Sequence, residues 1–115
     1  MKKLVRESLF EDMSQNFIEY FEDMSQEKKD KALINASRRG HTEAIKSRIN
    51  AGADVHAYND LALRWASDNG HVKVVKLLLD AGANVYAEKG LALRWAKYKG
   101  HTEIVKLLKQ YMNKR

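Results

Sequence analysis

Three histidines recur at a fixed interval and are the first candidates for chemistry. His41, His71 and His101 are spaced 30 residues apart, and each of them follows a glycine. Histidine is the commonest metal ligand among side chains, but a metal site needs ligands that converge within about 2 Å of one ion. Equivalent positions on neighbouring packed helices lie roughly 8–10 Å apart. We therefore predict a ladder of structural histidines and no metal site.

Other constellations that carry catalysis are missing from the sequence. The chain has no cysteine, which excludes disulfides, thiolate zinc sites and cysteine nucleophiles. It also lacks a glycine-rich phosphate loop, a Ser/His/Asp set outside the repeating pattern and a carboxylate pair in an apolar pocket. We predict a protein that is not an enzyme and uses no cofactor. The absence of cysteine also predicts a reducing compartment, which places the protein in the cytoplasm.

The glycine–histidine pairs mark three near-copies of one sequence unit, at residues 30–59, 60–89 and 90–115. A fixed period of this length indicates stacked repeats. In the second copy an apolar, helix-favouring segment follows Asp60, which we expect to cap it. The same slot holds Asp30 in the first copy and Gly90 in the third.

Each copy predicts a pair of helices and a connector. Gly70 suits the left-handed conformation that ends a first helix. A second helix with a wide apolar face then begins at Val72. Residues 81–84 (Ala-Gly-Ala-Asn) end that helix, and residues 85–89 form a short extended connector to the next copy.

This unit resembles an ankyrin repeat. The match includes Gly70-His71, Val74-Val75, Leu77-Leu78 and residues 82–85 (Gly-Ala-Asn-Val), and the resemblance extends from Asp30 to about Tyr111. The family's usual Thr-Pro-Leu-His is replaced by Leu-Ala-Leu-Arg at residues 61–64 and 91–94. The period is 30 residues instead of the usual 33, which predicts stunted hairpin fingers.

The resemblance implies an all-α, ankyrin-type helical solenoid of three repeats that binds a protein partner. Short repeats with a Leu-Arg-Trp-Ala core are also similar to those of large DNA viruses. That similarity implies a viral origin, with the host cytosol as the location.

Residues 1–29 precede the repeats and are predicted to form amphipathic helices. Because a solenoid needs an element that covers its first exposed face, we interpret this segment as an N-terminal helical cap. One apolar stripe can also dock a partner or a second copy. A dimer through residues 1–24 therefore stays open beside the favoured monomer.

The charge is distributed unevenly along the chain, which has a net charge of +6. Residues 1–29 contain five basic and seven acidic residues, whereas residues 30–115 contain sixteen and eight. A basic repeat body predicts a protein partner with an acidic patch, or nucleic acid. No apolar run approaches the roughly 18 residues of a membrane span, and the amino-terminal sequence lacks the apolar core of a signal peptide.

Candidate binding residues are the positions that differ between copies, because identical repeats need identical core residues. The resemblance implies that these positions line the concave groove and the finger tips. They comprise Arg38, Arg39, Asp68, Asn69, Tyr98 and Lys99 before the glycine–histidine pairs, and His56, Tyr58, Tyr86 and Lys89 in the connectors. Tyrosine and arginine are frequent interface anchors.

Three further sets repeat in register. Arg64 and Arg94 occupy the position of the ankyrin histidine, and for them structural and binding roles stay equally open. Trp65 and Trp95 are expected mainly in the core. A stripe of lysines on the second helices is expected to be solvated; it comprises Lys46, Lys76 and Lys106.

The predicted function is a non-catalytic protein-binding module, which acts as an inhibitor or decoy by docking a partner on a basic and aromatic concave face. Two alternatives are nucleic-acid binding by the repeat body and an oligomerising structural role through the N-terminal helices. Asp68 and Glu88 interrupt the basic groove. This interruption favours protein over nucleic acid.

Overall fold

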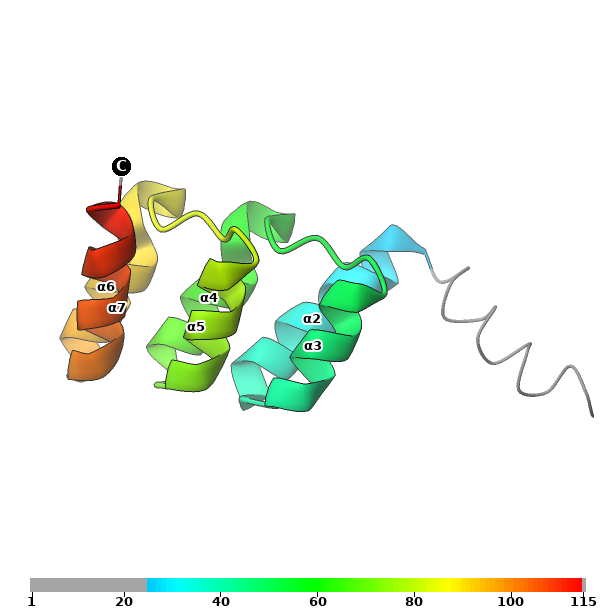
Figure 1. Cartoon of the computed structure of the whole chain (residues 1–115), viewed down its shortest axis with the longest axis horizontal. Helices are drawn as coiled ribbons and strands as arrows, with labels where there is room; N and C mark the ends of the chain where they lie inside the picture. The colour runs from blue at the N-terminus through cyan, green and yellow to red at the C-terminus, as the bar shows by residue number, and fades with distance from the viewer. Residues whose placement is uncertain (1–24, 115) are drawn as a thin grey trace, which may run out of the picture.

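The computed structural model describes residues 25–114, which form three helix pairs stacked side by side (Figure 1). The helices are α2 (Gln26–Arg39), α3 (Thr42–Asn50), α4 (Ala57–Asp68), α5 (Val72–Asp80), α6 (Ala87–Lys99) and α7 (Thr102–Met112). The described part contains no strand. The predicted all-α solenoid is therefore confirmed. The part of the predicted cap that precedes Ser25 lies outside the described residues.

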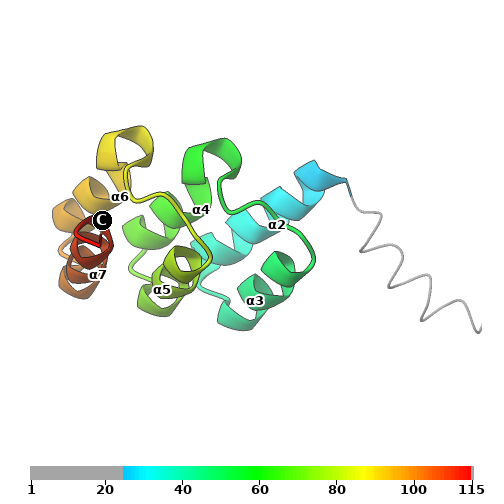
Figure 2. The same cartoon turned by 45° about the horizontal axis from the view of Figure 1, so that its top comes forward.

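The helices form two layers, seen from two directions in Figures 1 and 2. The first helices of the pairs, α2, α4 and α6, make one layer, and the second helices, α3, α5 and α7, make the other. Neighbouring first helices pack more closely on one another than neighbouring second helices do. The turns that carry the glycine–histidine pairs lie along one edge of the stack, and the connectors lie along the opposite edge.

Small and branched apolar side chains fill the space between the pairs. In the middle repeat Ala62, Ala66, Val75 and Leu78 are at most 1 % exposed. Alanine at two positions of α4 leaves room for the neighbouring first helices to approach, since interaxial distance depends on the side chains at the contact. The periodic apolar pattern of the sequence is thus the pattern of the core.

The predicted caps Asp30 and Asp60 are wrong. Helix α2 begins at Gln26, and the hydroxyl of Ser25 accepts a hydrogen bond from the Lys28 N–H at 3.3 Å. Asp30 lies inside this helix, where its carboxylate accepts from the Asp54 N–H at 2.7 Å. A buried carboxylate at this position therefore satisfies the backbone of the loop that follows the second helix, instead of the start of the first helix.

The same arrangement recurs one repeat later. Asp60 is buried, and its carboxylate accepts from the Asn84 N–H at 2.8 Å. The Asn84 side chain in turn accepts from the Tyr86 N–H at 2.9 Å, a local turn that asparagine commonly makes. The last repeat has Gly90 at this position, which carries no carboxylate.

The prediction of extended connectors is wrong, because each connector ends in a left-handed turn. Tyr58, Asn59 and Asp60 have φ values of 55°, 58° and 57°, and this turn opens α4. For ordinary residues the left-handed helical conformation costs roughly 1–2 kcal/mol per residue. The guanidinium of Arg64 offsets part of this cost, because it donates to the carbonyl oxygens of Tyr58 at 2.7 Å and Asn59 at 3.1 Å.

Candidate functional site

The recurring histidines join each repeat to the one before it. Nε2 of His71 donates to the carbonyl oxygen of Arg38 at 2.8 Å, and Nε2 of His101 donates to that of Asp68 at 2.9 Å. The predicted structural role at the inter-helix turn is confirmed for these two residues. Among residues 25–114, no three His, Asp or Glu side chains gather closely enough to hold a metal ion.

The predicted binding residues fall into two rows on the layer of first helices. One row, the turn edge, comprises Arg38, Arg39, Asp68, Asn69, Tyr98 and Lys99 at the ends of α2, α4 and α6. The other row, the connector edge, comprises His56, Tyr58, Tyr86 and Lys89 at the beginnings of α4 and α6. Tyr58 and Asp68 are ten residues apart along one helix, which corresponds to roughly 15 Å. The structure therefore places the predicted residues on one layer but not in one patch.

Polar contacts between repeats hold much of the connector edge in place. The Tyr58 hydroxyl donates to the Glu27 carboxylate at 3.4 Å, and the Tyr86 hydroxyl donates to the Met112 carbonyl oxygen at 3.0 Å. These two tyrosines are nevertheless 52 % and 43 % exposed. His56 lies 3.1 Å from the buried Asp60 carboxylate. The edge thus presents aromatic rings in fixed positions.

The turn edge combines paired and unpaired side chains. The Arg38 guanidinium lies 5.6 Å from the centroid of the Trp65 ring, within cation–π range. The Lys99 ammonium lies 3.1 Å from the Asp68 carboxylate. Tyr98 is 87 % exposed and is the most exposed large apolar side chain of the described part. Part of the predicted positive charge on this edge is therefore neutralised within the chain.

An open groove of about 420 Å³ lies between α2 and α4 and reaches the connector edge at Tyr58. It is lined by Lys31, Ile34, Asn35, Tyr58, Leu61 and Trp65. Only Tyr58 of this set was predicted as a binding residue, and Trp65 was expected mainly in the core. Trp65 is in fact only partly buried.

Reasoning from variable positions missed the floor of this groove. Leu61 and Trp65 recur as Leu91 and Trp95, and identity between copies predicts core positions. A usable signal was present, because residues four apart share one helix face. The first repeat has Lys31 and Asn35 at these two positions, which marks a face that is not uniformly buried.

The rim of the groove carries one close ion pair. The Lys31 ammonium lies 3.1 Å from the Glu27 carboxylate, four residues away on α2. Its hydrogen bond and charge lower the pKa of Glu27, and the carboxylate raises the pKa of Lys31 in the same way. Both side chains are well exposed, so this pair contributes little to stability.

A family model described as "Ankyrin repeats (3 copies)" matches residues 3–89, which is most of the chain. The chain belongs to the ankyrin-repeat family. No curated protein matches it. Ankyrin repeats are generally protein–protein interaction modules, and the family is typically non-catalytic. The match begins before the described residues and ends in the first turn of α6, although α6 and α7 continue the same stack.

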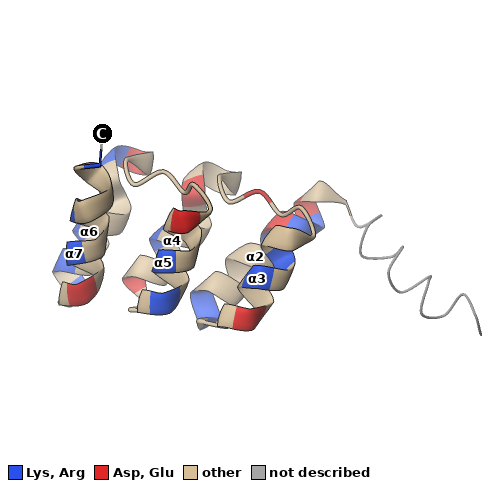
Figure 3. Ribbon diagram, in the orientation of Figure 1, with Lys and Arg blue, Asp and Glu red and all other residues tan. Residues whose placement is uncertain are grey.

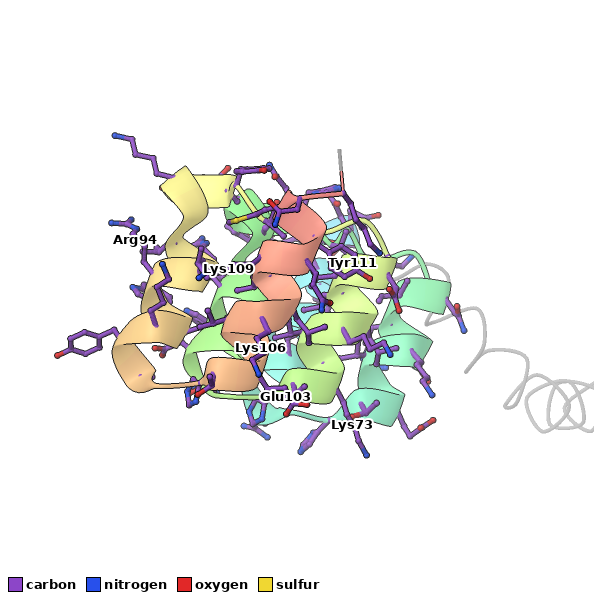
Figure 4. The ribbon with its side chains drawn as sticks, turned by 60° about the vertical axis from the view of Figure 1, so that its left-hand side comes forward. Lys73, Arg94, Glu103, Lys106, Lys109 and Tyr111 are labelled. Carbon is purple, nitrogen blue, oxygen red and sulfur yellow. The ribbon has the colours of Figure 1, made fainter. Side chains whose placement is uncertain are left out.

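The two arginines at the position of the ankyrin histidine differ from each other. Arg64 binds the left-handed turn of its own repeat. Arg94 is exposed and projects away from α6 (Figure 4). Within the described residues Arg94 makes no hydrogen bond to the corresponding turn at Glu88 and Lys89. The structure thus gives Arg64 a structural contact and leaves Arg94 accessible.

The layer of second helices is charged but mixed in sign. Each of α3, α5 and α7 carries two basic residues and one acidic residue near one end of the helix, and both charges are visible on this layer in Figure 3. Lys46, Lys76 and Lys106 are all exposed, as the solvated stripe predicts. Lys46 lies 3.5 Å from Glu43 on its own helix. Within residues 25–114, no helix combines the length and the apolar character needed to cross a membrane.

Proposed function

We propose that this ankyrin-repeat protein is a non-catalytic module that docks a protein partner on its first-helix face. We define this face as the groove between α2 and α4 together with the connector edge and the turn edge. The observation that carries the proposal is the open groove with Tyr58, Leu61 and Trp65 in its wall. Partly exposed aromatic side chains beside an arginine are the usual anchors of protein interfaces.

The contacts between repeats make this face rigid before any partner arrives. The histidine bonds tie the turn edge together, and the tyrosine hydroxyls tie the connector edge. A preorganised surface loses little conformational entropy on docking. Tyrosine and tryptophan add contact area at low entropic cost.

The charges around the groove favour a partner with an acidic patch. Lys31 lines the groove, Arg38 stacks on Trp65, and Lys89 and Arg94 are exposed nearby on the same layer. Such complementarity steers association and weakens as salt rises. A docked partner has its own surface blocked, which is the basis for proposing an inhibitor or decoy. Viral origin and a location in the cytoplasm, or the host cytosol, stay predictions from the sequence.

Nucleic-acid binding by the repeat body is the weaker alternative. Asp68 and Glu88 both lie on the first-helix face, where they contact Lys99 and Asn59. A phosphate backbone would meet these carboxylates along its path. Filter binding at two salt concentrations tests the alternative, since tight, sequence-indifferent binding with a steep salt slope supports nucleic acid. An oligomeric role through residues 1–24 is tested by light scattering, which measures whether the full chain is a monomer or a dimer.

Affinity capture with the full chain from cells of its native source tests the proposed face. Tyr58→Ala combined with Tyr98→Ala removes two exposed aromatic rings from the face and leaves the core intact. Lys76→Ala combined with Lys106→Ala is the matched control on the second helices. We expect the tyrosine variant to lose the captured protein and the lysine variant to retain it. Retention by both variants, or loss only with the lysine variant, contradicts the proposal.

A further inference from the structure

The amino-terminal end of the stack presents a face that is covered in the other two repeats. Ala96, Ile104 and Leu108 of the third repeat are fully buried against the second repeat. Their counterparts in the first repeat are Ala36, Ala44 and Arg48, of which Ala44 and Arg48 are partly exposed. The position of Trp65 and Trp95 is taken here by an exposed asparagine, Asn35. This end face is therefore smaller and more polar than its internal equivalents.

Positively charged side chains surround a second groove on this end face, which also has a volume of about 420 Å³. Its wall includes Arg38, Arg39, His41 and Arg48, and no carboxylate is among the described residues that line it. Arg48 stands where the other repeats have the buried Leu78 and Leu108. The end face thus carries positive charge where the equivalent face of the other repeats is apolar, and a segment with net negative charge is complementary to it.

His41 points to the same conclusion. Its counterparts His71 and His101 each donate to a carbonyl oxygen of the preceding repeat, and each is partly buried there. His41 is exposed in the described part of the chain. The end face thus has a histidine at the position from which His71 and His101 bind the backbone of the preceding repeat.

We propose that the chain's own residues 1–24 cover this end face and place acidic side chains in its basic groove. The segment is joined to α2 at Ser25, ten residues or roughly 15 Å along the helix from Asn35, and a chain of this length can span that distance to the groove. It carries six acidic and three basic residues, a charge opposite to that of the groove. The ankyrin match begins at residue 3, so the repeat-like sequence extends through the segment. In this arrangement Arg39 and Arg48 contact acidic side chains of the same chain. Arg38 also contacts Trp65 on the first-helix face.

Paramagnetic relaxation of backbone amides in the full chain tests this contact. The sequence has no cysteine, so a single Asn35→Cys change allows one nitroxide label at the groove. Gln110→Cys, an exposed position on α7 in the last repeat, is the matched control. We expect the label at position 35 to cause loss of amide signal across residues 1–24, and the label at position 110 to leave these signals unchanged. Equal effects of the two labels, or no loss with either, would overturn the proposal.

A mixed sample separates the chain's own segment from a second copy. Isotope-labelled chains without nitroxide are combined with unlabelled chains that carry the nitroxide at position 35. We expect the signals of residues 1–24 to be unaffected in this mixture. Signal loss in the mixture places the segment on a neighbouring molecule and overturns the assignment.

Charge reversal tests the electrostatic part of the proposal. Glu11→Lys combined with Asp12→Lys alters the segment without touching the folded repeats, and it should restore the amide signals lost with the label at position 35. High salt should act in the same direction, because at 1 M the Debye length falls to about 3 Å. Lys76→Glu combined with Lys106→Glu on the second helices should leave the signal loss unchanged. Signal loss that persists through both the segment variant and high salt rules out the charge pairing.

Discussion

The imidazole of His71 lies against Gly40 of the preceding repeat, so that a Cβ added to Gly40 would come within 2.6 Å of His71 Nδ1. His101 covers Gly70 in the same way, with a closest approach of 2.8 Å. The adjacent glycine and histidine thus face different neighbours. His71 and His101 each contact the preceding repeat, and Gly40 and Gly70 leave room for these two rings.

Gly40→Ala should therefore destabilise the protein more than Gly100→Ala. Both glycines have a φ near 80°, which costs ordinary residues roughly 1–2 kcal/mol. At Gly100 nothing lies within 4 Å of the added Cβ, so only the backbone cost applies. At Gly40 the His71 ring must also move, and overpacking of this kind typically costs about 1–3 kcal/mol more. Chemical denaturation of the two variants measures the difference.

The double variant Gly40→Ala, His71→Ala is the control for this interpretation. In the His71→Ala background the ring is absent. There, Gly40→Ala should lower the free energy of unfolding by no more than Gly100→Ala does in the unchanged protein. Equal losses for the two single glycine variants would show that the histidine does not press on Gly40.

Much of the fold follows from the repeat itself. The period, the Gly70 turn and the apolar face beginning at Val72 predict the helix pairs, because these features act within about 20 residues of sequence. The role of Asp60 could not be read in this way. A carboxylate before an apolar run is typical of a helix cap, whereas its actual donor, the Asn84 N–H, lies 24 residues away. Only the stacked structure brings the two groups together.

The candidate site was predictable only in part for a similar reason. Variation between copies correctly placed Tyr58 and Tyr98 among exposed residues. The groove depends on the spacing between α2 and α4. It also depends on the smaller Asn35, which the first repeat has at the position equivalent to Trp65. The left-handed turn was not predicted either: Asn59 and Asp60 are of types enriched in this conformation, but Tyr58 is not.

Asp60→Ala should lower the free energy of unfolding by about 1 kcal/mol, the net worth of a typical intramolecular hydrogen bond, since the bond is only partly buried. The lost bond is the one from the Asn84 N–H. Asp60→Asn keeps an oxygen acceptor and should lose less. Glu43→Ala, at a side chain that is 89 % exposed, is the control and should be close to neutral. Thermal or urea unfolding distinguishes the three, and equal stability of Asp60→Ala and Glu43→Ala would contradict this bond.

Arg64→Ala should destabilise the protein more than Arg94→Ala, although the two residues occupy equivalent positions. Arg64 donates to two carbonyl oxygens of a left-handed turn made of three non-glycine residues. The corresponding turn near Arg94 ends in Gly90, which adopts this conformation freely. We expect a loss of about 1 kcal/mol for Arg64→Ala, in the range of a net hydrogen bond. Denaturant midpoints that rank the variants in the opposite order would argue against a structural role of Arg64.

Alkaline pH should weaken the junction between the last two repeats. The Tyr111 hydroxyl donates to the carboxylate of Asp80, and the two side chains approach each other in Figure 4. This bond, with smaller contributions from burial and the negative charge, raises the pKa of Tyr111 above its usual 10.0. Its stabilising contribution is therefore fully present below pH 10 and is lost as the pH rises through the raised pKa of the folded state.

Ultraviolet titration of phenolate absorbance measures this shift. Asp80→Asn should lower the pKa of Tyr111, and Tyr111→Phe should remove the highest-pH part of the titration curve. Glu43→Gln changes the net charge equally at an exposed site and should leave the curve in place. A curve unchanged by Asp80→Asn would show that the bond does not form in solution.

Amide hydrogen exchange of the full chain, with and without the protein that it captures, measures most directly where the partner docks. We predict added protection along α2, α4 and the start of α6, centred on the groove that contains Tyr58 and Trp65. Protection confined to α3, α5 and α7 would contradict docking on the first-helix face.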